Sequence, residues 1–166
     1  MKLLILGAGT FAVEVLEMVE SRGELAIAGF LVSLEPPAPG ARHCGLPLHS
    51  ADAPPFGPDE CVLVSGIVST KRRAFIETML GRGYRFVSAV HRAAIVSPRA
   101  SIGAGCAIGA GVVIGAHTRL GGHVVVNRGA LVGHDNAIGA FTTVGPGANL
   151  AGALSVDEGC YVGVGA

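Results

Sequence analysis

Residues 101–116 read SIGAGCAIGAGVVIGA, and an aliphatic residue followed by glycine recurs there every six positions, at Ile102, Ile108 and Ile114. The spacing continues in both directions without an insertion. Twelve aliphatic residues occupy it: Val96, Ile102, Ile108, Ile114, Leu120, Val126, Val132, Ile138, Val144, Leu150, Val156 and Val162. Such a hexapeptide repeat is the sequence pattern of a parallel β-helix, in which three short strands form one coil of about eighteen residues.

The repeat also predicts which residues stack on adjacent coils. Residues eighteen apart should lie one above the other, separated by the spacing of paired strands, about 4.8 Å. Two neighbouring columns are therefore expected. The first holds Arg99, His117, Asp135 and Ala153, and the second holds Ala116, His134 and Gly152.

The chain before Val96 has a different pattern. Apolar runs predict strands at 2–6, 26–32, 61–65 and 85–90, and helical spacing predicts helices at 11–22 and 70–82. The stretch 35–58 is rich in proline and glycine, which predicts a loop with a short edge strand at 46–48. Alternating strands and helices favour a small parallel α/β domain. The expected domains are therefore residues 1–92 and 93–166.

Composition narrows the classes of function. The 166 residues carry 12 basic and 12 acidic side chains, so the formal net charge is zero. A nucleic-acid partner would require a basic patch, and none is expected. No apolar run is long enough for a transmembrane helix, and the apolar start is too short for a signal peptide. These features predict a cytoplasmic protein with no membrane partner, whose four cysteines are free thiols.

The first strand is followed by Gly7-Ala8-Gly9-Thr10-Phe11-Ala12, which fits the pattern G-x-G-x-x-[GA] between a strand and a helix. Glycines permit the tight turn, and a helix N-terminus attracts phosphate. A complete NAD site would place an acid at the end of the second strand, and Glu35 lies too far along the chain for that role. The phosphate of a nucleotide sugar is therefore the favoured ligand, and a purely structural turn is the alternative.

A second cluster of polar residues lies within the repeat, at 127–136. His134 and Asp135 occupy a corner of the predicted β-helix and should point outward. Ala116 and Gly152, the stacking neighbours of His134, are small and leave room for a substrate. A histidine serves as a general base near neutral pH, and an adjacent carboxylate can fix its tautomer. A solvated corner histidine is the alternative interpretation.

These residues resemble the family of sialic acid O-acetyltransferases and UDP-4-amino-sugar N-acetyltransferases. The resemblance covers nearly the whole chain, through the Gly7 loop, residues 91–98 at the domain junction, and the spacing of seven between Asn127 and His134. It implies a small Rossmann-like α/β domain followed by a left-handed parallel β-helix, assembled as a homotrimer. The handedness comes from the resemblance, because most parallel crossovers are right-handed.

The resemblance also implies an acetyltransferase that uses acetyl-CoA as co-substrate and acetylates the amine or the hydroxyl of a sugar or nucleotide sugar. His134 would be the general base, Asp135 would orient it, and Asn127 would position the base or the acceptor. The residues Gly7, Ala8, Gly9, Thr10 and Phe11 would hold the acceptor. The backbone of Gly152 would stabilise the oxyanion, and acetyl-CoA would lie near Gly145 and Gly163 at a subunit boundary. No metal is implied.

Three departures from the family pattern limit these expectations. The family's loop often has glycine at its fourth position and histidine or phenylalanine at its fifth, where this chain has Thr10 and Phe11. Members that bind UDP-sugars tend to carry acidic residues after the second strand, where this chain has Ser33-Leu34-Glu35. Both leave the acceptor sugar open. The repeat stops inside a hexad at Ala166, so we expect either a β-helix cut short there, with an incomplete acetyl-CoA site, or a short variant.

Two other functions remain open on the sequence. The chain could be a non-catalytic trimeric scaffold or sugar-nucleotide binder. A γ-type carbonic anhydrase also uses a trimeric left-handed β-helix, with interface histidines that bind zinc, and His117, His123 and His134 are available here. The α/β domain has no place in that enzyme class.

Overall fold

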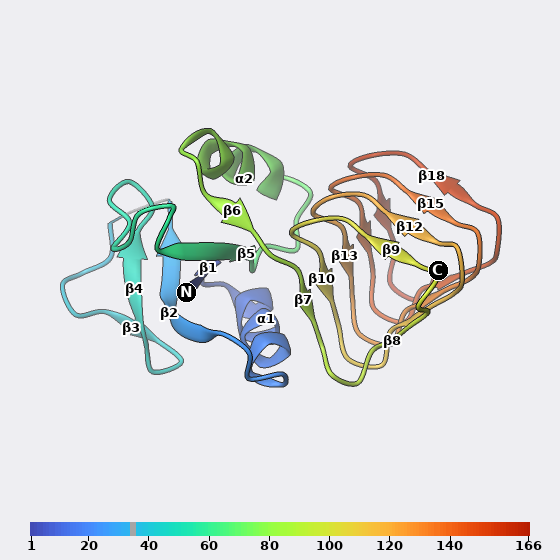
Figure 1. Ribbon diagram of the computed structural model, residues 1–166, viewed down its shortest axis with the longest axis horizontal. Helices are drawn as coiled ribbons and strands as arrows, with labels where there is room; N and C mark the ends of the chain where they lie inside the picture. The colour runs from blue at the N-terminus through green and yellow to red at the C-terminus, as the bar shows by residue number, and fades with distance from the viewer. Residues whose placement is uncertain (34–35) are drawn as a thin grey trace.

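The computed structural model describes residues 1–33 and 36–166, so Leu34 and Glu35 lie outside the described residues. An α/β part and a coiled β part lie side by side (Figure 1). The α/β part contains β1 (Lys2–Leu6), α1 (Thr10–Glu20), β2 (Ala26–Val32), β3 (Arg42–His43), β4 (Leu46–Ser50), β5 (Cys61–Ser65), α2 (Arg72–Gly81) and β6 (Arg85–Phe86).

The strands of the α/β part form one sheet in the order β3-β4-β2-β1-β5-β6. All pairs are parallel except β3 with β4, which is antiparallel. The expected parallel sheet is present, but the strand predicted at 46–48 is not the edge strand. Sequence reasoning missed β3, which pairs through Arg42 and His43 and covers that edge.

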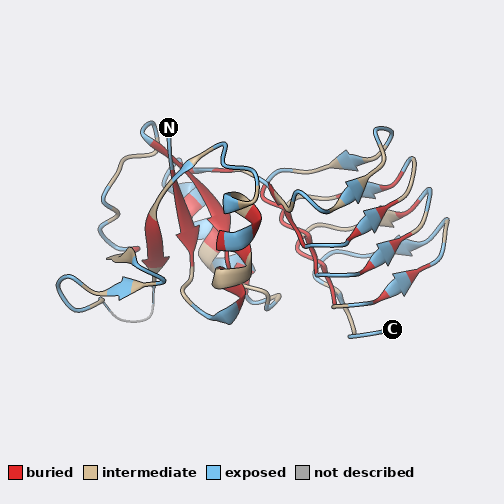
Figure 2. Cartoon of the chain, turned by 90° about the horizontal axis from the view of Figure 1, so that it is seen from below, coloured by how far each residue is buried: buried red, intermediate tan, exposed pale blue. Residues whose placement is uncertain are grey.

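The two helices cover opposite faces of this sheet. Alternate residues of β1 point to opposite sides, as the period of a strand requires. Leu3 and Ile5 pack with Phe11 and Val15 of α1. Leu4 and Leu6 belong to a separate cluster with Ile76 and Met79 of α2. The strands are therefore buried on both faces, as Figure 2 shows in red.

The hexads form the predicted coil. Short strands run from β7 (Ala89–Val90) through β8 (Ile95–Val96), β9 (Ser101–Ile102), β10 (Ala107–Ile108), β11 (Val113–Ile114), β12 (Arg119–Leu120), β13 (Val125–Val126), β14 (Leu131–Val132), β15 (Ala137–Ile138), β16 (Thr143–Val144), β17 (Asn149–Leu150) and β18 (Ser155–Val156) to β19 (Tyr161–Val162). Each pairs in parallel with the strand eighteen residues away, as Ala107 does with Val125 and Val125 with Thr143. The predicted register is confirmed.

Three sheets make the faces of a prism, which fits the expected left-handed parallel β-helix. The first face contains β7, β10, β13, β16 and β19; the second contains β8, β11, β14 and β17; the third contains β9, β12, β15 and β18. We call the turn from first to second face the first corner, the turn from second to third the second corner, and the turn back to the first face the third corner. The repeating aliphatic side chains fill the interior.

The prediction of one strand at 85–90 is wrong, because the structure has two short strands there, one in each part. Arg85–Phe86 completes the α/β sheet beside β5, whereas Ala89–Val90 pairs with β10 and begins the first face. Val90 lies six residues before Val96, so the hexad period begins earlier than the sequence analysis placed it. The division of the chain into domains at residues 92 and 93 stays a prediction.

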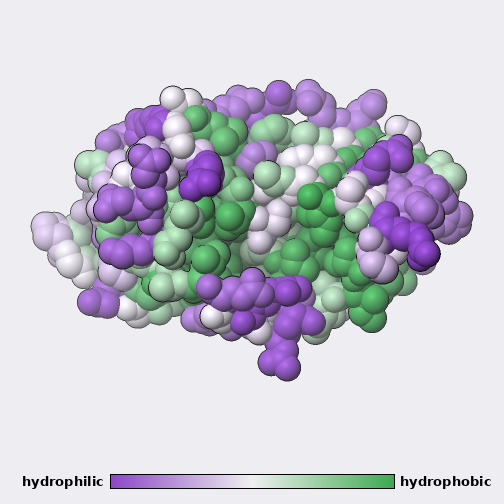
Figure 3. Space-filling view, viewed as in Figure 1, coloured by the Kyte–Doolittle hydropathy of each residue, from purple (hydrophilic) through white to green (hydrophobic). Residues whose placement is uncertain are grey.

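The α/β part packs on the first face of the prism. Ala89, Ala107 and Val125, which point outward from that face, belong to the same apolar cluster as Phe11 and Val15 of α1. Figure 3 shows apolar surface gathered where the two parts meet. No described helix has the length and apolar character needed to cross a membrane.

A buried arginine also joins the two parts. The guanidinium of Arg72, which is 1% exposed, donates to the carbonyl oxygens of Val68 and Ser69 and to Thr143 Oγ1. It also donates to the carbonyl oxygens of residues 123, 141 and 142 on the third corner. Burial lowers the pKa of Arg72 to about 10. This side chain therefore ties α2 and the Val68–Ser69 loop to the prism.

Candidate active site

The second corner carries the two residues that sequence analysis proposed for acid–base chemistry. His134 and Asp135 follow β14, and Nδ1 of His134 lies 2.8 Å from Oδ2 of Asp135. Asp135 adopts a left-handed backbone conformation, with φ of 54°, as His117 does one coil earlier in the same column. Both side chains are more than half exposed. In the neutral imidazole the carboxylate selects the tautomer with hydrogen on Nδ1, which leaves Nε2 free to accept a proton.

Gly152 lies directly over the imidazole, one coil further on. A Cβ atom on Gly152 would stand 2.6 Å from Nε2 of His134, closer than real contacts allow. The ring therefore occupies the space that a side chain would fill. The carbonyl oxygen of His134 accepts a hydrogen bond from Ala153 N–H, whereas the N–H of Gly152 has no partner among the described residues. The predicted column of Ala116, His134 and Gly152 is present.

Asn127, Gly145 and Gly163 share a different column, on the first corner. They lie eighteen residues apart, and Gly145 is in close backbone contact with Gly163. Oδ1 of Asn127 accepts a hydrogen bond from Arg128 N–H at 2.8 Å. The N–H of Gly145 donates to the carbonyl oxygen of Val162. Within one chain the structure brings His134, Asp135 and Gly152 together and places this second group on another corner.

The loop after β1 has the tight geometry that its glycines predict. Gly7 adopts φ of 90°, and a Cβ there would stand 2.7 Å from Cγ1 of Ile67. Its N–H donates to the carbonyl oxygen of Leu31. Ala8 follows, and Gly9 caps α1 without a side-chain hydrogen bond. The side chain of Phe11 is mostly in the core rather than at the surface.

A shallow depression of about 200 Å³ lies beside this loop. Gly9, Thr10 and Phe11 line one side, and residues 66–69, which follow β5, line the other. β1 lies between β2 and β5. The strands that follow β1 are added first on its β2 side and then on its β5 side, so the strand order changes direction at β1. Ligands of open parallel sheets bind at such a point, outside the carboxyl ends of the strands. Sequence reasoning missed residues 66–69, although their position directly after a buried strand was a usable signal.

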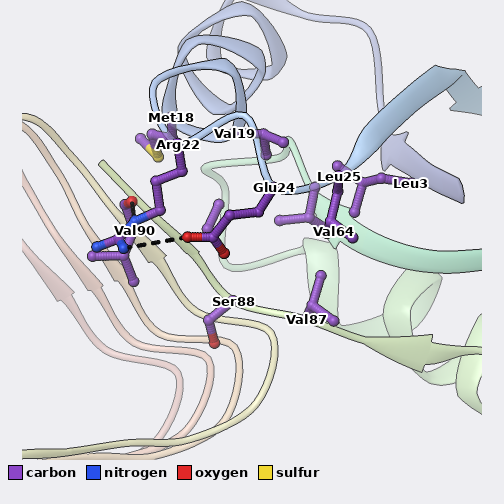
Figure 4. Close-up of a pocket in the computed structure, with 11 residues that line it drawn as sticks. Leu3, Met18, Val19, Arg22, Glu24, Leu25, Val64, Val87, Ser88 and Val90 are labelled. Atoms are coloured by element: carbon purple, nitrogen blue, oxygen red, sulfur yellow. Dashed lines mark hydrogen bonds and ion pairs between the residues drawn. The ribbon is translucent and has the colours of Figure 1, made fainter. Parts of the chain in front are cut away.

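One further cavity and one further histidine are less suited to substrate binding or acid–base chemistry. A more enclosed cavity between α1 and the Val87–Val90 segment (Figure 4) is mostly apolar and holds only about 40 Å³, with Arg22 and Glu24 at its edge. His123, one of the three histidines considered for zinc, is 9% exposed and stacks on Phe141. Among the described residues no group of three or more His, Cys, Asp or Glu could hold a metal ion.

Similarity to known proteins is found among solved structures. No protein-family model and no curated protein matches the sequence. Among solved structures, the chain is similar to PerB from Caulobacter crescentus in complex with CoA and GDP-perosamine. The identity is 31%, the TM-score is 0.87, and the match covers 97% of this chain and 76% of that one.

Two further structures are similar. The acetyltransferase domain of PglB from Neisseria gonorrhoeae is 28% identical, with a TM-score of 0.89, and the match covers 99% of this chain and 80% of that chain. WeeI from Acinetobacter baumannii, at 20% identity and a TM-score of 0.86, shares the fold over 99% of this chain and 79% of its own. From its resemblance to PerB along nearly its whole length, this chain belongs to the family of hexapeptide-repeat sugar acetyltransferases.

Proposed function

We propose that this chain transfers the acetyl group of acetyl-CoA to the amine of a nucleotide-linked amino sugar, with His134 as the general base. The observation that carries the proposal is the second corner, where Asp135 holds Nδ1 of His134 and Nε2 lies against Gly152. Membership of the sugar acetyltransferase family supplies the class of reaction. The complexes of PerB with CoA and GDP-perosamine support acetyl-CoA as donor and a nucleotide sugar as acceptor.

The proposed mechanism is direct transfer. The amine nitrogen attacks the thioester carbonyl carbon while Nε2 of His134 removes a proton from it. The resulting imidazolium is stabilised by the Asp135 carboxylate, 2.8 Å from Nδ1. The tetrahedral intermediate then collapses, the carbon–sulfur bond breaks, and the proton passes from His134 to the departing CoA sulfur. The products are the N-acetylated sugar and CoA.

The negative charge on the intermediate requires a hydrogen-bond donor. The free N–H of Gly152 is the proposed donor, because it lies on the coil that covers the imidazole. A preorganised backbone N–H at such a position typically contributes a factor of about 10² to 10³ to the rate. An acetyl-CoA thioester bound along the corner would place its carbonyl oxygen there.

The acceptor site is proposed at the depression beside the Gly7 loop, in a domain that we interpret as Rossmann-like. The N-terminus of α1 and the N–H groups of residues 68 and 69, which have no acceptor among the described residues, would bind a diphosphate, whereas those of residues 66 and 67 donate to Leu6 and Ser65. In one chain, however, this depression adjoins the first face, where Thr143 Oγ1 donates to the carbonyl oxygen of Val68. The second corner lies on the opposite side of the prism (Figure 1). A substrate held at the loop would therefore need His134 from another subunit.

A cyclic homotrimer would meet that requirement. Ile95, Val113 and Leu131 stack as an exposed apolar ladder on the outer side of the second face. Monomeric proteins rarely expose continuous apolar surfaces, and closed rings bury them. In such a ring the His134 corner of one subunit and the Asn127, Gly145 and Gly163 corner of a neighbour would form one acetyl-CoA site. The cytoplasm is the proposed location.

The proposed function is tested by incubating the purified chain with acetyl-CoA and a panel of nucleotide-linked amino sugars that includes GDP-perosamine. Release of the CoA thiol and the mass of the acetylated product are measured together. We expect transfer by the wild type and a loss of at least about 10²-fold in kcat in His134→Ala. His117→Ala, an exposed histidine one coil away, is the matched control and should keep full activity. Equal activity in both variants would contradict the role of His134. Absence of thiol release, or of an acetylated amine, with every acceptor would contradict the function.

A further inference from the structure

A buried amide lies directly beneath the second corner. Asn136 occupies the inward position of its hexad, where small or apolar residues usually stand, and it is 0% exposed. Its Oδ1 accepts a hydrogen bond from Leu154 N–H at 2.7 Å. Its Nδ2 donates to the carbonyl oxygen of Gly133 at 3.1 Å and to that of Ala151 at 2.9 Å. All the polar atoms of this side chain therefore bond to backbone, and the bonds fix the amide orientation.

The two carbonyl groups that Asn136 binds belong to the peptides that lead into the site. Gly133 C=O and His134 N–H share one peptide plane, and Ala151 C=O and Gly152 N–H share another. In a trans peptide the C=O and N–H bonds point in opposite directions. Because Asn136 holds both carbonyl oxygens inward, the N–H groups of His134 and Gly152 point outward, toward the proposed reaction site.

A hydrogen bond to a carbonyl oxygen also strengthens the N–H of the same peptide as a donor, since hydrogen bonds polarise one another in chains. Thr118, one coil below, extends this chain. Its Oγ1 donates to the carbonyl oxygen of Gly133 at 2.7 Å and accepts the N–H of Asn136 at 3.2 Å. A polar ladder of Thr118 and Asn136 thus supports the corner that carries His134.

We propose that Asn136 is a positioning residue for acetyl transfer: it sets the direction of the Gly152 N–H and its separation from the His134 imidazole. The inference rests on the proposed function of this corner. Asn136 itself touches neither donor nor acceptor, because it is enclosed in the prism. Its effect should therefore appear in kcat, through stabilisation of the oxyanion, rather than in the binding of substrates.

The chain contains a natural guide to the rescue variant. Thr142 occupies the same hexad position under the third corner, where its Oγ1 donates to the carbonyl oxygen of Asp157 at 2.7 Å and accepts the N–H of Cys160 at 3.2 Å. These partners stand at the same sequence offsets as Ala151 and Leu154 from Asn136. Asn136→Thr should therefore keep the bonds to Ala151 and Leu154, whereas Asn136→Ala removes them.

The experiment compares Asn136→Ala, Asn136→Thr and Thr142→Ala with the wild type. Thr142→Ala is the matched control, because it removes an equivalent buried bridge from a corner without catalytic groups. We expect Asn136→Ala to lower kcat by about 10- to 100-fold. The loss should not exceed the effect of removing an oxyanion donor altogether, because Gly152 N–H is still present in this variant. The KM for acetyl-CoA and the pH dependence of kcat should change little, because the His134–Asp135 pair remains. Asn136→Thr should recover most of the lost kcat, and Thr142→Ala should lose stability but not kcat.

A second measurement does not depend on activity. In chains labelled with ¹⁵N-glycine, the Gly152 amide resonance should shift in Asn136→Ala and return toward its wild-type position in Asn136→Thr. An unchanged Gly152 amide, or equal kcat losses in Asn136→Ala and Thr142→Ala, would overturn the inference while leaving the proposed function intact. An inactive wild type would overturn the function and the catalytic role together, and the amide shift would then still decide whether Asn136 orients this peptide.

Discussion

At the scale of single residues, the absence of a side chain at Gly152 gives the imidazole of His134 its place. Gly152→Ala would put a Cβ atom 2.6 Å from Nε2, so the ring must rotate away. The imidazole is the exposed end of its side chain, so its displacement costs little free energy of unfolding. We therefore expect kcat to fall at least about tenfold, because the base loses its geometry. The melting temperature should barely change. Steady-state thiol release and thermal unfolding by circular dichroism measure the two effects.

Gly122→Ala is the control for this prediction. Gly122 stands at the same hexad position on the third corner, and a Cβ there would meet its nearest atom, the carbonyl oxygen of Ala104, at an ordinary 3.5 Å. Its stacking neighbours at 104 and 140 are already alanines. Comparable kcat losses in the two variants would show that contact with His134 does not explain the need for glycine at 152.

The sequence predicted part of this site well, for a physical reason. A strict period of six fixes which residues stack, so the neighbourhood of His134, Asp135 and Gly152 followed from counting. The direction of each side chain did not follow, and neither did the support from Asn136. An asparagine in a hexad is a weak signal until its partners, the carbonyl oxygens of Gly133 and Ala151, are placed in space.

At the scale of elements, the contact between α2 and the third corner combines a buried arginine with an aromatic stack. The ring of His123 is parallel to Phe141 at 5.0 Å and edge-on to Phe86 at 5.1 Å. Nδ1 of His123 is buried without a hydrogen-bond partner. No local pattern in the sequence predicted this contact, because Arg72 and the backbone of His123 meet only when α2 docks on the prism.

This stack predicts a dependence of stability on pH. Burial, with a smaller effect of the charged Arg72 guanidinium, lowers the pKa of His123 below its ordinary value of 6.5. The unfolded chain therefore takes up a proton first as the pH falls. The contribution of the neutral, buried His123 to the free energy of unfolding should therefore be complete above about pH 6.5. It should be lost as the pH falls from there through the lowered pKa of the folded state.

The variant His123→Phe tests this dependence. Phe141 has the same φ of 59° one coil further on, so phenylalanine is compatible with this backbone. We expect the melting temperature of His123→Phe to fall less than that of the wild type between about pH 7 and pH 5. His49→Phe, at a histidine of β4 remote from the stack, serves as the control and should leave the slope unchanged. Parallel slopes in the wild type and His123→Phe would show that His123 does not cause the acid-dependent loss.

At the scale of the whole molecule, a single chain holds its proposed acceptor site and its proposed general base on different sides of the prism. The α/β part covers the first face, whereas the His134 corner joins the second and third faces. The sequence predicted both parts, since the first has alternating strand and helix patterns and the second has the six-residue repeat. Their relative placement could not be predicted, because it depends on contacts such as Arg72 with Thr143, which join residues far apart in the chain.

The second face should therefore be the surface on which subunits meet. Its outward ladder of Ile95, Val113 and Leu131 is apolar, whereas the corresponding third-face residues begin with Ser101 and Arg119. Leu131 is 42% exposed in the single chain, and Leu131→Glu would place charges in the buried interface of a trimer. We expect the wild type to sediment as a trimer and Leu131→Glu to dissociate.

Sedimentation velocity and thiol release on the same samples connect assembly with catalysis. Dissociated Leu131→Glu should lose acetyl transfer even though its own His134, Asp135 and Gly152 are intact, because the acceptor loop of one subunit would no longer face the second corner of another. Ser101→Glu, which adds the same charge to the third face, should remain trimeric and active. A fully active monomer would exclude a site shared between subunits, and would require the Gly7 loop and His134 of a single chain to approach each other across the prism.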